Sequence, residues 1–370
     1  MSNLVLYRKY RPKTFSEIIG QEHIVQTITN AISSRMISHA YLFSGPRGSG
    51  KTTIARLIAK SVNCLDRREN EYEPCNRCEN CKEINEARSI DLIEIDAASN
   101  RGVDEIRELK DGIKFAPTKS KYKVFIIDEA HQLTKEAANA LLKTLEEPPV
   151  HAIFILATTE IHRMLPTIIS RCQRFDFRKL SLPEILKKLE LICKRENAKI
   201  EKNALKLIAL NSQGSIRDAE SLLDQVLTFA EGSKGEIKSE EIKDLLGLVD
   251  IGLVSQLVDF LCEKKSDEAI NFLNKTLEKG YDPYEFIKVL INYLRKILLF
   301  KISPETLNLE IFGLTKEDQK KLQAQVEKFK EEEIRQSLKL FLEAANKMKF
   351  SPIPQLPLEI AIIEVIGLKE

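Results

Sequence analysis

Residues 45–52 contain every fixed position of the phosphate-binding loop pattern G-x-x-x-x-G-K-[ST]. In such a loop, backbone N–H groups and a helix N-terminus surround a phosphate chain, and glycines allow the backbone to approach it closely. The lysine would reach the β- and γ-phosphates, and the final hydroxyl would bind Mg²⁺. The pattern therefore predicts nucleotide contacts along one run of the chain, namely Gly45, Pro46, Arg47, Gly48, Ser49, Gly50, Lys51, Thr52 and Thr53.

A second set of residues suited to chemistry is the pair Asp128 and Glu129, which directly follows an apolar run at residues 124–127. The run predicts a strand buried on both faces, so the two carboxylates would lie at the carboxyl edge of a sheet, where open α/β sheets bind ligands. Asp128 would hold Mg²⁺ through the water shell of the metal, and Glu129 would polarise the attacking water. Together with Lys51, these residues predict a site that hydrolyses a nucleoside triphosphate.

Two further residues could complete this chemistry. Thr158 ends another buried run, where its hydroxyl could bond the γ-phosphate or the water, or could simply make a turn. Arg217 lies in the first turn of a predicted helix with Ser215 as its N-cap, where the helix dipole disfavours a cation. A γ-phosphate in front of Arg217 would remove that conflict, although the neighbouring Asp218 could also neutralise the charge.

Four cysteines follow the phosphate-loop region with the spacing C-x10-C-x2-C-x2-C. Four thiolates this close can form a tetrahedral Zn²⁺ site, which would be structural because no coordination position stays open. An iron–sulfur cluster has a related spacing, but the usual following Cys-Pro is missing, and unligated cysteines do not suit an exposed, charged loop. The predicted zinc ligands are Cys64, Cys75, Cys78 and Cys81, whereas Cys172, Cys193 and Cys262 are isolated and expected to be small buried hydrophobic residues.

The elements that must position these residues alternate between strands and helices up to about residue 180. Helical patterns without strand signals follow, and residues 231–235 form the clearest linker. The sequence therefore predicts an α/β ATPase domain with a parallel sheet at residues 1–179, a small helical lid domain at 180–237 and an all-α domain at 238–370.

Residues 1–40 precede the phosphate loop and contain the turn-forming Pro12 and a predicted helix that begins at about residue 22. Their position suits a lid over an adenine base, with Arg11, Pro12 and Ile19 as the expected contacts. An N-terminal arm that packs on the sheet is an equally good interpretation.

Composition narrows the class of protein. The 370 residues are 43% hydrophobic and 30% charged, with a formal net charge of +2. The balanced charge gives no nucleic-acid signature for the whole chain, so any DNA contact must come from a local patch. Neither a signal peptide nor a membrane-spanning stretch is evident, and seven cysteines argue against a disulfide framework. We therefore expect a cytoplasmic protein that does not bind membranes.

Several local signatures point to one family. They are residues 7–12 and 19–23 near the N-terminus, the four-cysteine insertion, the run 141–149 and the element Ser170-Arg171-Cys172. With these residues the chain resembles the gamma/tau family of bacterial DNA polymerase III clamp-loader ATPases over nearly its whole length. The resemblance implies an AAA+ module, which is a parallel-sheet P-loop domain plus a helical lid, followed by an all-α collar domain for oligomerisation.

The resemblance also implies roles and partners. Arg171, which ends a short predicted helix where a cation is stable without any function, would reach the ATP site of a neighbouring subunit in trans. Arg217 and Thr158 would sense the γ-phosphate within their own subunit. With ATP, Mg²⁺ and Zn²⁺ bound, the chain would join delta-type, delta-prime-type and further gamma subunits in a pentamer. That pentamer would open the sliding clamp and load it on primed DNA during replication.

Two other functions remain open. The chain could be a structural scaffold that binds ATP within a replication complex, although the intact Glu129 speaks against this. It could also be a helicase, because residues 128–131 read Asp-Glu-Ala-His. Helicases of that kind typically need a second α/β motor domain, which the helical patterns after residue 180 do not offer.

Overall fold

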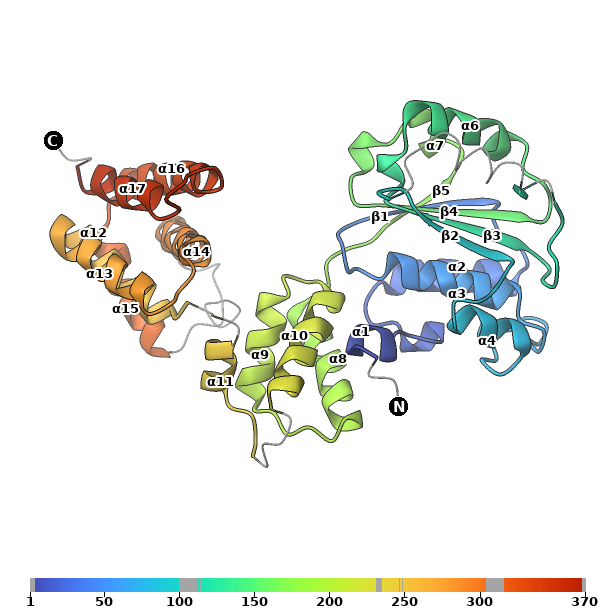
Figure 1. The fold of residues 1–370 in the computed structure, drawn as a ribbon, viewed down its shortest axis with the longest axis horizontal. Coiled ribbons are helices and arrows are strands. Elements are labelled where there is room, and N and C mark those ends of the chain that lie inside the picture. Colours follow the sequence, from blue (N-terminus) through green and yellow to red (C-terminus); the bar gives the residue numbers. More distant parts are fainter. Residues whose placement is uncertain are drawn as a thin grey trace. The chain divides into compact units, whose positions relative to one another are not determined.

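The computed structural model describes residues 4–99, 112–113, 115–230, 235–245, 247, 249–303 and 316–367. The chain divides into two compact units, residues 1–198 with 208–231 and residues 199–207 with 232–370 (Figure 1). Most of the predicted linker, residues 231–234, lies outside the described residues.

The first unit is built on a sheet of parallel strands in the order β2-β3-β4-β1-β5. Every residue of the central strands β1 and β4 is buried, and for β4 this agrees with the predicted buried run that ends at Thr158. At the edge, only Phe175 of β5 is buried, so this strand lacks an apolar run and sequence analysis missed it. The strands are β1 (Ala40–Ser44), β2 (Leu92–Asp96), β3 (Lys123–Asp128), β4 (Ala152–Thr158) and β5 (Gln173–Asp176).

The register of the sheet decides which strand ends meet. Ser44 of β1 lies opposite Thr158 of β4, and Asp96 of β2 lies opposite Asp128 of β3. The carboxyl ends of parallel strands share one edge, so polar residues from separate parts of the sequence gather there. β1 leads directly into the phosphate loop at the same edge.

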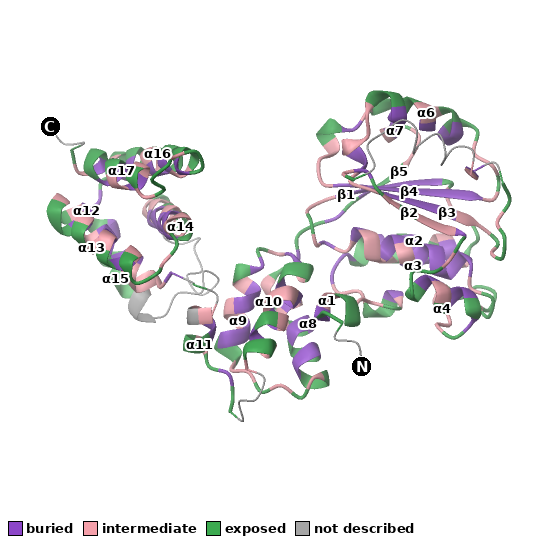
Figure 2. Cartoon of the chain, viewed as in Figure 1, coloured by how far each residue is buried: buried purple, intermediate pink, exposed green. Residues whose placement is uncertain are grey.

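Helices cover both faces of this sheet (Figure 1). On one face, α2 (Glu22–Ser33) and α3 (Lys51–Val62) share a core with β1 that contains Ile28, Ile58 and Phe43. On the other, α6 (Lys135–Glu146) and α7 (Pro166–Ile169) contribute Leu141 and Ile168 to a second core. Figure 2 shows the buried residues concentrated on the strands and on the helix faces that meet them.

Two lid helices complete the first unit. α8 (Leu182–Arg195) packs against α10 (Ile216–Phe229), and α10 also packs on the N-terminal helix α1 (Leu6–Lys9). α10 begins as predicted, because Ser215 Oγ accepts a hydrogen bond from the Asp218 N–H at 3.2 Å. The helix α9 (Lys202–Asn211) lies between α8 and α10 in the sequence, and its residues 208–211 belong to the first unit.

Short elements fill the loops of the first unit. The turn η1 (Phe15–Glu17) precedes α2, and α4 (Glu79–Asn85) follows the cysteine insertion. The turns η2 (Ala130–Gln132) and η3 (Ile161–Arg163) follow β3 and β4.

Apart from one isolated bridge between Ile200 and Ile237, the regular secondary structure described for the second unit is helical, and its apolar residues form a core. The helix α16 (Glu331–Met348) contributes Ile334, Phe341 and Met348 to that core, and all three are fully buried. No helix that the structure describes is long and apolar enough to cross a bilayer. Its helices are α11 (Ser239–Leu245), α12 (Ile251–Glu263), α13 (Ser266–Glu278), α14 (Pro283–Ile302), α15 (Lys316–Lys328), α16 (Glu331–Met348) and α17 (Leu356–Gly367).

The observed elements confirm the predicted fold class. A parallel-sheet α/β module carries the phosphate loop, lid helices follow it, and an all-α region ends the chain.

Candidate functional site

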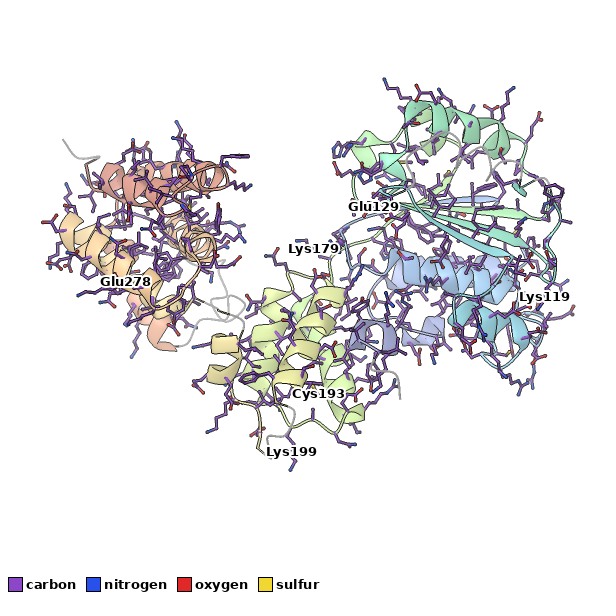
Figure 3. All side chains as sticks on the ribbon, in the orientation of Figure 1. Lys119, Glu129, Lys179, Cys193, Lys199 and Glu278 are labelled. Atoms are coloured by element: carbon purple, nitrogen blue, oxygen red, sulfur yellow. The ribbon has the colours of Figure 1, made fainter. Side chains whose placement is uncertain are left out.

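A pocket in the first unit lies where the carboxyl edge of the sheet meets the phosphate loop, the N-terminal arm and the lid helices. Figure 3 labels Glu129 at this edge of the sheet. Predicted residues that line the pocket are Arg11, Pro12, Ile19, Arg47, Gly48, Ser49, Gly50, Lys51, Thr52, Thr53, Asp128, Glu129 and Arg217. Predicted residues that do not line it are Gly45, Pro46, Thr158 and Arg171.

Two glycines of the phosphate loop are required by close contacts. Gly45 has φ +149°, and a Cβ there would lie 2.4 Å from the backbone oxygen of Phe177. Gly48 has φ +73°, and a Cβ there would lie 1.9 Å from Ser215 Oγ. The Ile216 N–H also donates to the Gly48 carbonyl at 3.2 Å. The start of α10 is therefore docked directly on the phosphate loop.

Lys51 is held by the loop itself. Its side chain is buried, and Nζ donates to the carbonyl oxygens of Gly45 at 2.7 Å and Pro46 at 2.9 Å. Burial lowers the pKa of the Lys51 ammonium. Carbonyl groups are weak partners for a buried cation, so an anionic phosphate chain in this pocket would be a better one.

The carboxylates of Asp128, which ends β3, and of Glu129, which follows it, have different partners. Thr52 Oγ1 donates to Asp128 Oδ2 at 2.9 Å, which joins the phosphate loop to the strand end. Glu129 Oε2 accepts hydrogen bonds from the hydroxyl of Thr159 at 2.8 Å and from its N–H at 3.3 Å. Hydroxyl and carboxylate oxygens are the ligands that Mg²⁺ prefers, so Thr52 with Asp128 could hold that ion, and Glu129 stays separate from it.

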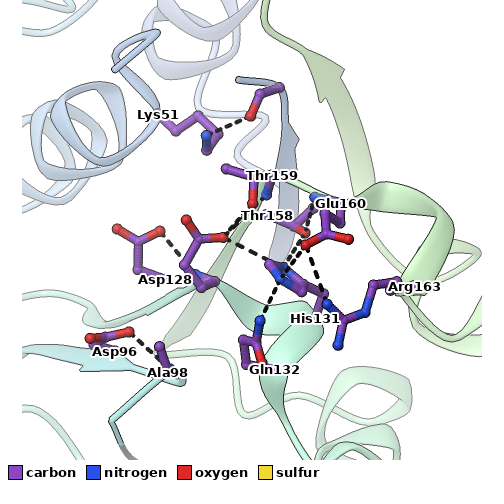
Figure 4. A network of polar contacts seen from close by, with 12 residues as sticks. Lys51, Asp96, Ala98, Asp128, His131, Gln132, Thr158, Thr159, Glu160 and Arg163 are labelled. Atoms are coloured by element: carbon purple, nitrogen blue, oxygen red, sulfur yellow. Dashed lines mark hydrogen bonds and ion pairs between the residues drawn. The ribbon is translucent and has the colours of Figure 1, made fainter. Parts of the chain in front are cut away.

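Thr158, the last residue of β4, is fully buried. Its hydroxyl is 2.9 Å from His131 Nδ1 and accepts from the Glu160 N–H at 3.0 Å (Figure 4). Sequence analysis named His131 only within the run Asp-Glu-Ala-His, and it gave neither His131 nor Thr159 a role in this site. The two adjacent threonines gave no indication of which one would meet Glu129, and a buried histidine on a turn carries no sequence signal.

The two predicted arginines occupy different places. Arg217 lines the pocket, with its guanidinium carbon 5.0 Å from the centre of the Tyr7 ring. Arg171 instead donates to Glu146 Oε1 at 2.5 Å and to the Thr167 carbonyl at 2.7 Å. Both bonds hold Arg171 at the end of α7 rather than in the pocket of its own chain.

An ion pair that the sequence did not indicate closes the far wall of the pocket. Lys188 Nζ of α8 lies 3.7 Å from Glu220 Oε1 of α10 and donates to the Tyr10 carbonyl at 2.9 Å. Burial raises the pKa of Glu220 to about 7 and lowers the pKa of Lys188. Since Arg11 and Pro12 follow Tyr10, this pair ties the lid to the arm that lines the pocket.

The four clustered cysteines form a separate site beyond the other end of α3. The sulfur atoms of Cys64, Cys75, Cys78 and Cys81 all lie within 4.8 Å of one another. The Cys64–Cys78 and Cys75–Cys81 sulfur pairs are each 4.0 Å apart. A tetrahedral zinc with Zn–S bonds of about 2.3 Å places its sulfurs about 3.8 Å apart, so the arrangement fits such an ion. Of the isolated cysteines, Cys193 is buried, and Cys172 and Cys262 are partly buried.

Three protein-family models match consecutive parts of the chain. The model described as DNA polymerase III, delta subunit, matches residues 20–181. The model for the ATPase lid domain of a DNA polymerase III clamp loader subunit matches residues 184–232. The model for domain III of DNA polymerase III subunits gamma and tau matches residues 237–370.

Relatives match along the whole chain. It is 38% identical over 367 residues to DNA polymerase III subunit gamma of Buchnera aphidicola subsp. Acyrthosiphon pisum, which covers 99% of both chains. It is 43% identical over 371 residues to DNA polymerase III subunit tau of Bacillus subtilis, which covers 99% of this chain. The chain spans 63% of that tau subunit and 47% of the tau subunit of Escherichia coli.

A solved structure shares the fold. The RuvB Holliday junction branch migration motor of Thermotoga maritima superimposes with a TM-score of 0.50 over 69% of this chain and 80% of RuvB. The sequences are 21% identical, so this likeness concerns the fold alone.

Proposed function

The chain belongs to the family of DNA polymerase III gamma and tau subunits, and on this premise we propose that it is an ATP-hydrolysing subunit of a clamp loader. ATP binding and hydrolysis would open a sliding clamp and load it on primed DNA, with no polymerase active site in this chain. The observation that carries the proposal is the single pocket that joins Lys51, the Thr52–Asp128 pair and Glu129.

We assign the following roles in that pocket. Lys51 and the backbone N–H groups of residues 47–53, which line the pocket, bind the phosphates, and Arg11, Pro12 and Ile19 cover the adenine. Thr52 and Asp128 hold Mg²⁺, which when bound neutralises charge on the phosphate oxygens. Glu129 orients the attacking water and accepts its proton.

The positions of Arg217 and Thr158 support their proposed roles in sensing the γ-phosphate. Arg217 reaches the pocket from the lid, so it can pull the lid onto the γ-phosphate. Thr158 acts through the strand end that it shares with Thr159, the residue that holds Glu129.

Assembly would complete the site. The contacts of Arg171 with Glu146 and Thr167 keep it outside its own pocket and are partly exposed, which suits a residue that serves a neighbouring subunit. In the second unit, Leu356, Ile360 and Ile363 of α17 are 42%, 46% and 56% exposed and follow a helical spacing. We propose that delta-type, delta-prime-type and further gamma subunits cover such surfaces in a pentamer.

The cysteine cluster would hold a structural Zn²⁺. Its four sulfurs leave no coordination position for a substrate. The consecutive family matches also support three domains, an ATPase domain at 1–179, a lid at 180–237 and a collar at 238–370.

Steady-state ATP hydrolysis with and without clamp, primed DNA and delta-type subunits tests the proposal. Glu129→Gln should bind ATP normally and lose at least about a hundredfold in turnover, because a general base contributes that much. Glu136→Gln, an exposed residue of α6, is the matched control. Unchanged turnover in Glu129→Gln would instead favour the alternative function, a scaffold that binds ATP as a structural element.

A further inference from the structure

The cysteine insertion holds the segment that lines the nucleotide pocket. The Glu73 side chain, two residues before Cys75, accepts hydrogen bonds from the backbone N–H groups of Phe15 and Ser16, both at 2.8 Å. These amides open the short turn η1, and the side chain of its own N-cap residue Thr14 makes no capping bond to a backbone amide. One carboxylate from the insertion therefore caps a turn of the N-terminal arm.

A buried lysine makes the second connection. Lys60, near the end of α3, is 2% exposed, and its ammonium donates to the Lys13 carbonyl at 2.7 Å, Asn76 Oδ1 at 2.7 Å and Asn85 Oδ1 at 2.9 Å. An ammonium has three donors, and all of them are used here. Asn76 lies between Cys75 and Cys78, and its own amide donates to the Lys13 carbonyl at 3.1 Å.

Apolar packing follows the same path. The Tyr72 ring of the insertion meets the Phe15 ring edge-on, with 6.4 Å between ring centres. Phe15 is 1% exposed and belongs to the core beneath α2 and α3. The insertion thus contacts residues 13–16 in three ways: through the Glu73 carboxylate, through the hydrogen bonds of Lys60 and Asn76, and through the Tyr72 ring.

Residues 13–16 lie between two stretches of the pocket wall. Arg11 and Pro12 come immediately before them, and Glu17, Ile18 and Ile19 come immediately after. A shift of residues 13–16 would therefore move both stretches. Conversely, a metal ion that fixes the conformation of the cysteine insertion would also fix residues 11–12 and 17–19 of the pocket wall.

We propose that Glu73 and Lys60 are positioning residues that couple the four-cysteine site to the nucleotide pocket, so that metal bound by the cysteines strengthens nucleotide binding at the phosphate loop. The proposal rests on the proposed nucleotide site. Coupling between two sites is reciprocal, so bound nucleotide must strengthen metal retention by the same factor.

The test uses the full chain and two binding measurements. Calorimetric titration with ADP and with ATPγS measures nucleotide affinity in the Zn²⁺-loaded parent, in chelated parent and in loaded Glu73→Gln. Transfer of Zn²⁺ to a chromophoric chelator, with and without ADP, measures metal retention. Glu73→Gln keeps the size of the side chain but leaves one acceptor oxygen for two amides.

We expect chelation and Glu73→Gln each to weaken nucleotide binding by about 5- to 50-fold, within the usual range for coupled sites. ADP should slow metal transfer from the parent and should do so much less in Glu73→Gln. Glu71→Gln is the matched control, since its side chain lies in the same insertion and pairs only loosely with Arg68, at 3.8 Å. Lys60→Met should weaken nucleotide binding in the same direction as Glu73→Gln.

Equal nucleotide affinity in loaded parent, chelated parent and Glu73→Gln would overturn the coupling while leaving the nucleotide site intact. No nucleotide binding by the loaded parent would instead reject the proposed function, and the coupling with it. Thermal unfolding of each variant separates lost coupling from a lost fold, because Glu73→Gln should still unfold cooperatively.

Discussion

The two ends of α3 carry candidate sites of opposite character. At its N-terminus, the charged groups of Lys51, Asp128 and Glu129 are held by carbonyl and hydroxyl groups that a ligand can replace. Beyond its C-terminus, four sulfurs face one another closely enough to satisfy a metal completely. A site that binds a ligand therefore keeps its charged side chains on protein groups that the ligand can replace. A structural metal site has no such replaceable partner, because all four of its sulfurs would bind the metal.

Metal removal should separate the two sites most strongly. Chelation of Zn²⁺ should abolish the slow amide hydrogen exchange of residues 64–81, because structural zinc contributes about 10 kcal/mol or more in small domains. Removal of Mg²⁺ should leave exchange around residues 45–53 nearly unchanged, since Thr52 and Asp128 bond each other directly. Slow amide hydrogen exchange of residues 64–81 after chelation would show that the cysteine insertion does not depend on metal for its structure.

The next largest effect is expected at Arg171. If Arg171 acts in trans, as we propose, its replacement should reduce DNA-stimulated hydrolysis by about a thousandfold in the reconstituted assembly. ATP affinity should stay within about twofold, because Arg171 does not line its own pocket. Arg174→Ala, on the neighbouring strand β5, is the matched control. Equal loss in both variants would mean that the region matters only for structure.

A smaller effect should show how tightly the lid is docked on the open site. Gly48→Ala should destabilise the first unit by about 2 kcal/mol in the absence of nucleotide, because positive φ is strained for alanine and its Cβ would overlap Ser215. Gly50→Ala is also strained, at φ +99°, but meets no atom within 4 Å. Thermal unfolding of the two variants separates the effect of the Ser215 contact, which only Gly48→Ala disturbs, from backbone strain, which both variants have. Equal destabilisation of the two variants would argue against docking of the lid on the phosphate loop.

The smallest effect should come from the ion pair between Arg178 and Glu184, which lies in the first turn of the lid helix α8 and depends on pH. A hydrogen bond from Arg178 lowers the pKa of Glu184 to about 2, below its usual 4.5. The ionised carboxylate therefore stabilises the fold above pH 4.5, and this stabilisation is lost as the pH falls toward 2.

Glu184→Gln should consequently lower the unfolding temperature more at pH 7 than at pH 3. The difference at pH 7 should be about 1 kcal/mol, because the Arg178–Glu184 pair is partly exposed. Glu190→Gln, exposed on the same helix, serves as the control. A Glu184→Gln effect that does not change with pH would contradict the assigned ion pair.

Sequence patterns predicted both sites because each depends on local spacing. The phosphate loop, the carboxylates after β3 and the cysteines all lie on short motifs with fixed chemistry. The fold class followed from buried apolar runs, and β5 was missed because one buried Phe175 makes no such run.

The connections between sites could not be predicted in the same way. Glu73 meets the arm across 57 and 58 residues of sequence, and Thr159 meets Glu129 only because β3 and β4 are neighbours. The Lys188–Glu220 pair likewise requires α8 to pack on α10. Such contacts depend on tertiary structure, which no local motif specifies.

Our proposal for the assembled protein is that Arg171 of one chain completes the pocket of another. It is tested most directly by hydrolysis in assemblies that contain equal amounts of Lys51→Ala and Arg171→Ala chains, together with delta-type subunits, clamp and primed DNA. Each variant alone should be nearly inactive, whereas the mixture should recover part of the parent turnover where an intact pocket meets an intact Arg171. A mixture as inactive as either variant alone would mean that Arg171 does not act on the pocket of a neighbouring chain.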